Sequence, residues 1–334
     1  MENLYLNGDC FEVLKDLSGL FFDAVITDPP YLYLDHHLDS FFDEETLINE
    51  VNRILKPNSF FVFFGRGESY FKMNYLATSF TSFASSTSST SSKEKPKPLF
   101  KFKEELIWDK INTSSGTLKI GRCHENISLL AKGKPTLNKI LINKIENDSI
   151  IDSHRIEDDL KRILSTIQSI NTLEELNDFK NYRYKVRPKK FKHGITMSPD
   201  TVFVEPDRGC GLYRSHTKGR LMPSVVRVKP EHYQFLHPTQ KPIEIMKRLI
   251  LMTTKEGDTV LDPFGGVAST AIACLETNRK YVVIEKNEEY HRLGVERITK
   301  WHNDKLNNSG IHQIPELIER VQVENEETGQ LSLF

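Results

Sequence analysis

The sequence contains little cysteine and no long apolar run. Its 334 residues include four cysteines, none in a C-x-x-C pair or at a repeated spacing. This scarcity excludes a disulfide framework and a structural zinc site, so we expect a reducing compartment and no metal. No apolar stretch reaches the roughly 18 residues of a membrane span, and the N-terminus lacks the basic and apolar segments of a signal peptide. We therefore expect a cytoplasmic protein that does not enter a membrane.

A large net charge is also missing, because the formal charge is −1. A nucleic-acid surface would then have to come from local asymmetry. Between Lys180 and Lys229, thirteen lysines and arginines stand against three acids, and Tyr182, Tyr184, Phe191 and Tyr213 are interleaved with these charges. So dense an excess is typical of a phosphate-contacting surface, although charge runs are usually solvated faces. The candidate DNA-binding residues are Lys185, Arg187, Lys189, Lys190, Lys192, Arg214, Lys218 and Arg220.

Short apolar runs alternate with helix-patterned stretches along most of the chain. These runs are residues 23–27, 59–65, 127–131, 258–262 and 280–285. Such alternation predicts a mostly parallel sheet covered by helices, so the fold class is α/β.

Two segments depart from this pattern. Residues 78–98 begin with a Ser/Thr-rich tract that cannot bury enough apolar surface to offset its ordering entropy, so we predict a disordered loop. Residues 156–170 place isoleucine and leucine at helical spacing on a charged background. This spacing predicts an amphipathic helix, and we expect its apolar stripe to be core.

A glycine loop lies in "DTVLDPFGGVASTAIACLE" (258–276), which predicts a strand, a sharp turn and a helix. Gly265 and Gly266 let a ligand approach the backbone, and the helix N-terminus offers free N–H groups. The next strand ends on Glu285, 23 residues after Asp262. An acid there can accept hydrogen bonds from ribose hydroxyls. Because "FGGVAS" is not the dinucleotide motif G-x-G-x-x-G, we predict another adenosine-containing cofactor.

A second strand-end motif is "TDPPY" (27–31). Prolines fix φ and lack N–H groups, so this stiff turn presents only acceptors, the Asp28 carboxylate and the Pro29 carbonyl. Tyr31 adds a flat ring. Two acceptors beside an aromatic ring suit a planar ligand with an exocyclic amine, such as a nucleobase, whereas a simple capped turn would leave the full quartet Asp28, Pro29, Pro30 and Tyr31 unexplained.

Segment 106–125 holds two further features that we interpret as structural. His124 and Glu125 are adjacent, and no P-C-x-x-C follows, so they do not match the zinc deaminase motif. We expect them to be structural or network polar groups. Trp108 is expected in the core or in a pocket wall.

Taken together, "DPPY" (28–31) and "LDPFGG" (261–266) resemble the catalytic motif and the cofactor loop of amino-group DNA methyltransferases that use S-adenosylmethionine. The order of the motifs resembles the β-class arrangement. That arrangement implies a Rossmann-like, circularly permuted sheet in which residues 4–10 continue after the strand at 280–285. "HPTQKP" (237–242), before the glycine loop, is similar to a further family segment.

The resemblance implies roles for individual residues. Asp28 and the Pro29 carbonyl would hold the target amine in the rigid turn made with Pro30, and Tyr31 would stack on the base. Cofactor-binding residues would surround the methionine part, the ribose and the adenine; they are Asp9, Cys10, Lys241, Asp262, Phe264, Gly265, Gly266 and Glu285.

The resemblance also implies a division of the chain. A catalytic core would comprise residues 1–77, 99–135 and 233–301. The loop 78–98 and an inserted target-recognition region, 136–232, would interrupt this core. Residues 302–334 would form a flexible tail.

The implied activity is methylation of adenine N6 in a specific double-stranded DNA sequence after base flipping. Cytosine N4 is the alternative, since N4 members more often have serine where Asp28 stands. A nucleotide-dependent oxidoreductase and a regulatory DNA-binding protein with an inactive site are alternatives from other classes. The resemblance further implies a bacterial or phage restriction-modification protein associated with the nucleoid, and it leaves a homodimer open.

The tail ends in "QLSLF" (330–334), which resembles the peptide that binds the bacterial sliding clamp. Leucines and a phenylalanine at the end of a polar tail are typical anchors of a docking peptide. Gln330, Leu331, Leu333 and Phe334 would make the contact. A tail that packs on its own domain, or has no partner, is the alternative.

Overall fold

The computed structural model describes residues 3–30, 42–79, 98–114, 122–143, 153–181, 183, 208–230 and 240–309. The chain divides into two compact units, one made of residues 1–138 and 224–334 and the other of residues 139–223. Most of the predicted loop 78–98 and of the predicted tail lies outside the described residues.

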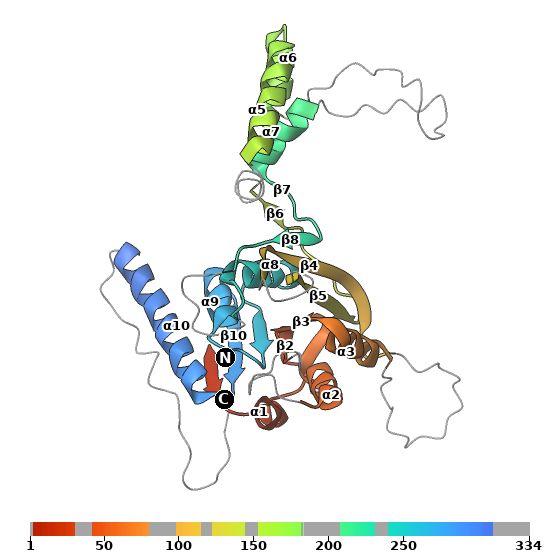
Figure 1. Cartoon of the computed structure of the whole chain (residues 1–334), viewed down its shortest axis with the longest axis vertical. Coiled ribbons are helices and arrows are strands. Elements are labelled where there is room, and N and C mark those ends of the chain that lie inside the picture. The colour runs from red at the N-terminus through yellow and green to blue at the C-terminus, as the bar shows by residue number, and fades with distance from the viewer. Residues whose placement is uncertain are drawn as a thin grey trace, which may run out of the picture. The chain divides into compact units, whose positions relative to one another are not determined.

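The larger unit is built on one eight-stranded sheet with the order β1-β10-β9-β2-β3-β5-β4-β8 (Figure 1). The first five strands are parallel, β5 is antiparallel to both β3 and β4, and β8 is parallel to β4. All five predicted strands are confirmed, and so is the α/β class. The bounds are β1 (Leu4–Asn7), β10 (Lys280–Glu285), β9 (Thr259–Asp262), β2 (Phe22–Thr27), β3 (Leu55–Gly65), β5 (Arg122–Lys132), β4 (Lys101–Ser114) and β8 (Val225–Arg227).

The N-terminal strand lies beside a strand from the far end of the sequence. β1 pairs in parallel with β10, with Leu4 opposite Val282 and Asn7 opposite Glu285. This pairing confirms the prediction for residues 4–7 of the segment 4–10, whereas Cys10 already belongs to the following helix. The circular permutation itself stays a prediction.

Helices cover both faces of this sheet, with α8, α9 and α10 on one side and α1, α2 and α3 on the other (Figure 1). Alternate strand residues such as Val25, Phe61 and Phe63 form one core cluster with α1, α2 and α3, because successive side chains of a strand point to opposite faces. The bounds are α1 (Cys10–Asp16), α2 (Glu44–Ile54), α3 (Gly67–Ser79), α8 (Ile243–Thr253), α9 (Ser269–Glu276) and α10 (Glu288–Ser309).

Two predicted boundaries differ from the structure. α3 includes Thr78 and Ser79, which were predicted to open the disordered loop, and α10 continues through residues 302–309, predicted as tail. Polar residues extend both helices because an exposed helical turn needs no apolar burial once a helix has formed.

The smaller unit contains α5 (Ser153–Gln168), α6 (Leu173–Lys180), α7 (Arg208–Lys218) and the short pair β6 (Leu141–Ile142) and β7 (Arg220–Leu221). Its core cluster of buried residues is Ile163, Phe179 and Cys210. Gly209 lets α7 approach α5 closely, since a Cβ there would lie 2.0 Å from the Thr166 hydroxyl.

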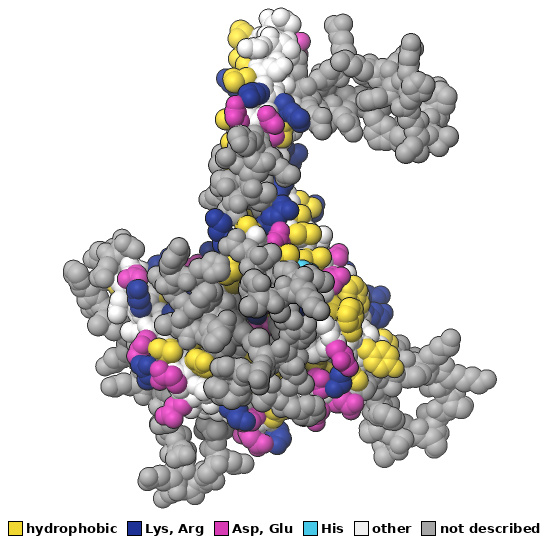
Figure 2. All heavy atoms as spheres, in the orientation of Figure 1, with side chains coloured by type: hydrophobic (Ala, Val, Ile, Leu, Met, Phe, Trp, Pro, Cys, Tyr) yellow, Lys and Arg dark blue, Asp and Glu magenta, His cyan; other side chains and the backbone are white. Residues whose placement is uncertain are grey.

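The helix predicted within 156–170 is confirmed as α5, but the expectation that its apolar stripe is core is wrong for three of its six residues. Leu160, Leu164 and Ile167 are 51%, 57% and 40% exposed, and hydrophobic side chains reach the surface of these helices in Figure 2. The face that packs on α7 has Asp159, Ile163 and Thr166, which are buried. The buried face is thus offset by about one residue from the apolar one.

Candidate active site

The two predicted strand-end motifs lie at neighbouring strands. β2 pairs in parallel with β9, so both strands end at the same edge of the sheet. The Thr27 hydroxyl donates a 2.7 Å hydrogen bond to Oδ1 of Asp262. This bond joins the last residue of β2, just before Asp28, to the last residue of β9, just before the glycine loop.

Asp262 is buried and supports the start of the glycine loop. Besides the Thr27 bond, its carboxylate accepts from the Thr270 hydroxyl at the start of α9 and, over 3.1 Å, from the Phe264 N–H. Burial raises the pKa of Asp262 to about 6, against the effect of these hydrogen bonds. The structure therefore places Asp262 inside the fold, where it links β2, the loop and α9.

Gly265 and Gly266 meet two different requirements. A Cβ on Gly265 would lie 2.0 Å from Cγ1 of Val283, so only glycine lets the loop pack against β10. Gly266 has φ +52°, which favours glycine, and a Cβ there would meet no atom within 4 Å. The backbone at Gly266 therefore has open space beside it.

Contacts from separate elements fix the backbone of Gly266 and its neighbours. Its N–H donates to Oε2 of Glu285 over 2.8 Å, and its carbonyl accepts from the hydroxyl of Tyr5 on β1. Arg297 of α10 donates to the Val267 carbonyl over 2.9 Å. Burial, then the charges of Glu285 and Asp262, raises the pKa of Tyr5, so its hydroxyl stays a donor.

Sequence reasoning missed Tyr5 and Arg297. A Cβ on Gly294 would lie 2.5 Å from the Tyr5 ring, so that glycine of α10 makes room for Tyr5. A glycine within a helical pattern was the available signal.

Glu285 lies at the end of β10, as predicted, beside the glycine loop. Its Oε1 accepts from the Asn287 N–H over 2.8 Å, in addition to the Gly266 bond on Oε2. Burial raises its pKa, while backbone N–H donors, those of Asn287 and Gly266 among them, lower it. Each carboxylate oxygen accepts one of these bonds and has a second lone pair.

Asp9 and Cys10 follow β1 and come to the same end of the sheet as Glu285. Asp9 caps α1 by accepting from the Phe11 N–H over 2.9 Å, and it pairs with Lys286 at 2.9 Å. Burial opposes, but the Lys286 ammonium and the Phe11 N–H lower the pKa of Asp9. Cys10 is buried, and burial raises the pKa of its thiol to about 12.

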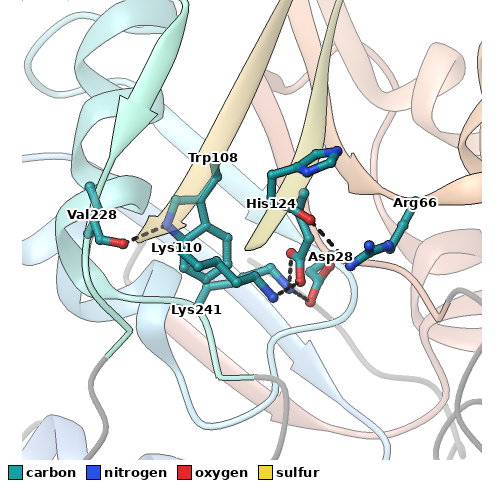
Figure 3. A network of polar contacts seen from close by, with 8 residues as sticks. Asp28, Arg66, Trp108, Lys110, His124, Val228 and Lys241 are labelled. Atoms are coloured by element: carbon teal, nitrogen blue, oxygen red, sulfur yellow. Dashed lines mark hydrogen bonds and ion pairs between the residues drawn. The ribbon is translucent and has the colours of Figure 1, made fainter. Parts of the chain in front are cut away.

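Asp28 is part of a network of charged side chains (Figure 3). Its Oδ2 pairs with the ammonium of Lys241, just before α8, and Lys241 also lies 3.1 Å from Oε2 of Glu125 on β5. The other oxygen of Glu125 pairs with Lys110 of β4. Lys241 and Glu125 are buried, and Asp28 has a 17% exposed side chain.

The pKa shifts of Glu125 and Lys241 favour the charged form of each group. Burial works against the charged form of both Glu125 and Lys241, but their partners outweigh it. The Lys241 and Lys110 ammoniums lower the pKa of Glu125, and the Asp28 and Glu125 carboxylates raise the pKa of Lys241.

Two aromatic rings border the Lys241 ammonium. Its Nζ lies 5.0 Å from the centre of the Phe64 ring and 5.9 Å from that of Trp108. Trp108 is buried and donates to the Val228 carbonyl over 2.8 Å, which confirms its prediction as a core residue.

Glu125 is a network polar group, as predicted, but its link through Lys241 to Asp28 of the DPPY turn was not foreseen. It stands near the start of β5 rather than at a strand end. Because β5 runs antiparallel to β3, its start lies at the edge where the parallel strands finish. Lys241 was predicted to bind the cofactor; the structure places it on Asp28 and Glu125, and the predicted role stays a prediction.

Several predicted site residues lie outside the described residues. Three of the DNA-binding candidates are described: Arg214 and Lys218 are exposed on α7, and Arg220 is half-buried in β7. Those not described are Tyr31, Lys185, Arg187, Lys189, Lys190, Lys192, Gln330, Leu331, Leu333 and Phe334.

In the described ranges, no group of three or more His, Cys, Asp or Glu residues is placed to hold a metal ion. No helix among the described residues is long and apolar enough to cross a membrane.

The family model of N6/N4 methyltransferases, described as DNA methylase, matches residues 22–296. The chain belongs to this DNA methylase family. The match spans both strand-end motifs and the network between Asp28, Lys241 and Glu125. It confirms the resemblance stated from the sequence.

Relatives within the DNA methylase family share short segments with this chain. The DNA adenine methyltransferase YhdJ of Escherichia coli is 45% identical over 62 residues, which are 19% of this chain and 21% of YhdJ. The type II methyltransferase M.HpaI of Haemophilus parainfluenzae is 38% identical over 117 residues, 33% of this chain and 35% of M.HpaI. The chain thus spans about a fifth to a third of the length of these relatives.

Solved structures resemble the DNA methylase chain over most of its length. The PvuII DNA methyltransferase, titled cytosine-N4-specific, has 14% identity and a TM-score of 0.49, and the match covers 92% of this chain and 95% of PvuII. The M1.HpyAVI complex with SAM has 19% identity and a TM-score of 0.46, with 88% and 98% of the two chains covered.

Proposed function

We propose that this protein transfers a methyl group from S-adenosylmethionine to the exocyclic N6 of adenine in a specific double-stranded DNA sequence. Membership of the DNA methylase family supports this proposal. The observation behind it is the Thr27 to Asp262 hydrogen bond, which brings the acceptor-only turn at Asp28 beside the glycine loop. An amine held at one motif is then next to a cofactor held at the other.

The residues around the loop fit S-adenosylmethionine. Gly266 has open space beside its backbone, and the Glu285 carboxylate beside it can accept from ribose hydroxyls. The N-terminus of α9 has no side-chain cap, so its N–H groups can face a carboxylate. Phe264, Gly265 and Gly266 would wrap the methionine part, Glu285 would hold the ribose, and Asp9 and Cys10 would lie near the adenine. Bound there, S-adenosylmethionine supplies an electrophilic methyl group on its sulfonium.

The DPPY turn would prepare the amine for attack. The adenine N6 lone pair is delocalised into the ring, which makes this nitrogen a poor nucleophile. The Asp28 carboxylate and the Pro29 carbonyl would accept its two N–H bonds and draw the nitrogen toward tetrahedral geometry. The same acceptors stabilise the positive charge that develops on the nitrogen, and the proline-stiffened turn aims them in advance.

A base inside a duplex cannot reach Asp28, so the target must be flipped out. Unstacking costs a few kcal/mol. Stacking on the Tyr31 ring would offset part of this cost.

Adenine is the proposed base because Asp28 stands where cytosine-N4 members of the family more often have serine. The 45% identity to YhdJ, a DNA adenine methyltransferase, supports the same choice. Methylation of cytosine N4 is the second candidate.

We propose residues 136–232 as the target-recognition region, with the basic residues named above as DNA contacts. The compact unit 139–223 lies within this range and supports the division. A bacterial or phage source, clamp docking through residues 330–334 and a homodimer are further parts of the proposal.

Labelled S-adenosylmethionine and unmethylated duplex DNA, followed by nucleoside analysis, test the activity. We expect N6-methyladenine. N4-methylcytosine would overturn the choice of base, and absence of transfer would overturn the function. Sequencing DNA from an expressing host with detection of modified bases then gives the recognition sequence.

A further inference from the structure

Four charges of alternating sign follow one another behind the DPPY turn. They are Asp28, Lys241, Glu125 and Lys110, and each contacts the next. Buried ion pairs cost desolvation energy, and replacing them with apolar side chains often leaves stability unchanged. Stability therefore does not explain why two carboxylates share one buried ammonium beside the proposed acceptor.

The Lys241 ammonium occupies a position that the target amine needs. The target amine would donate a hydrogen bond to Oδ2 of Asp28. In this structure the Lys241 ammonium donates to that oxygen instead. Lys241 also adds a positive charge beside the place where the amine becomes positive. An ammonium bound to Asp28 alone would therefore compete with the amine.

Glu125 offers Lys241 a second partner. Its Oε2 lies 3.1 Å from Nζ of Lys241, so the ammonium can shift toward Glu125 without losing its ion pair. Lys110 sits on the opposite oxygen of Glu125 and limits how strongly Glu125 attracts Lys241. The Phe64 and Trp108 rings border the ammonium while it stays in place.

We propose that Glu125 is a positioning residue for Asp28, acting through Lys241. Before DNA binds, Lys241 holds the Asp28 carboxylate aligned and stands in for the amine. When the amine arrives, Glu125 takes the larger share of the ammonium and Oδ2 of Asp28 is released to the amine. This inference rests on the proposed function, because it concerns the entry of the target amine.

Glu125→Gln tests the inference, because it preserves shape and removes the charge. Lys241 is then left on Asp28, so kcat/KM for duplex DNA should fall about thirtyfold near neutral pH. The dissociation constant for S-adenosylmethionine, measured by calorimetry, should stay within about twofold. Glu125→Asp restores the charge and should recover part of the activity.

The pH profile separates positioning from a structural role. Asp28 and Glu125 face Lys241, with Lys110 behind Glu125 and Asp262 within electrostatic range of Asp28. Losing Glu125 removes one of the two carboxylates that raise the pKa of Lys241, so that Asp28 alone opposes the lowering effect of burial. Lys241 in Glu125→Gln should therefore deprotonate at a lower pH than in the unaltered protein and release Asp28, so the defect should shrink as pH rises. A defect that is constant with pH would overturn the inference.

Lys110→Met should act in the opposite direction. Without Lys110, Glu125 attracts Lys241 more strongly and the hold on Asp28 weakens, so kcat/KM should rise about threefold. A fall as large as that of Glu125→Gln would overturn the inference, because the site would then respond to any lost charge. Glu104→Gln, an exposed residue of β4, is the matched control for folding and assay.

The unaltered protein separates the two proposals. If the unaltered protein transfers methyl groups and Glu125→Gln has the same kcat/KM, the role of Glu125 is rejected and the proposed function stands. No transfer by the unaltered protein would reject both. Thermal unfolding of each variant shows that a changed rate does not come from loss of the fold.

Discussion

The glycine loop and helix α5 differ in how many contacts hold them in the fold. The loop backbone is fixed from β1, β10 and α10, and Asp262 behind it accepts three hydrogen bonds. In the unit 139–223, α5 buries Ile163 but leaves Leu164 57% exposed beside it. The first region has little freedom to rearrange, and the second depends on a small core. Small changes to single side chains near the loop should therefore abolish function in the larger unit. In the smaller unit, substitutions should act mainly by unfolding it.

The largest effect is expected where the larger unit meets the target amine. Asp28→Ala removes the carboxylate acceptor and should lower kcat about a thousandfold, because the acceptor acts mainly in the transition state. S-adenosylmethionine affinity should hold, which calorimetry would show. Near-normal turnover would contradict the role of Asp28.

A pair of glycine substitutions compares the two regions directly. Gly265→Ala places a Cβ 2.0 Å from Val283 and should destabilise the larger unit by about 3 kcal/mol and weaken cofactor binding. Gly211→Ala on α7 meets no atom within 4 Å and should stabilise the smaller unit by about 0.5–1 kcal/mol. Thermal unfolding measures both. Equal effects would show that the loop is not the more constrained region.

The pKa of Asp262 gives the larger unit its own pH dependence. Burial raises this pKa to about 6. Between about pH 4 and pH 6, Asp262 is therefore protonated in the folded protein and ionised in the unfolded chain. The associated stability is present below the unfolded pKa and is lost as pH rises from about 4 to about 6, on the order of 3 kcal/mol. In Asp262→Asn, unfolding should lose this dependence. An unchanged pH profile of the melting temperature would contradict the assignment.

The smallest effects separate buried from exposed positions on α5. Ile163→Ala removes a buried side chain and should destabilise the smaller unit by about 2 kcal/mol. Leu164→Ala, at the neighbouring exposed position, should change stability by less than about 0.5 kcal/mol. Hydrogen exchange of the α5 amides measures both. A large loss in Leu164→Ala would show that the exposed stripe is covered in solution.

The sequence alone determined five strands of the eight-stranded sheet, the order of the motifs and the family. Apolar runs bounded by polar residues identified β2, β3, β5, β9 and β10, since burial on both faces of a parallel sheet requires continuous apolar runs. The DPPY and glycine motifs were visible because their chemistry resides in contiguous residues. The same local logic placed Glu285 at the end of its strand.

Only the tertiary structure decided which side chains meet. Asp28, Glu125 and Lys241 are far apart in the sequence, and Lys241 can contact both carboxylates because the antiparallel direction of β5 brings Glu125 to this edge of the sheet. The buried face of α5 likewise depends on where α7 packs, which the spacing of apolar residues did not reveal. Local pattern follows from the chain itself, whereas ion pairs and buried faces follow from which elements the fold brings together.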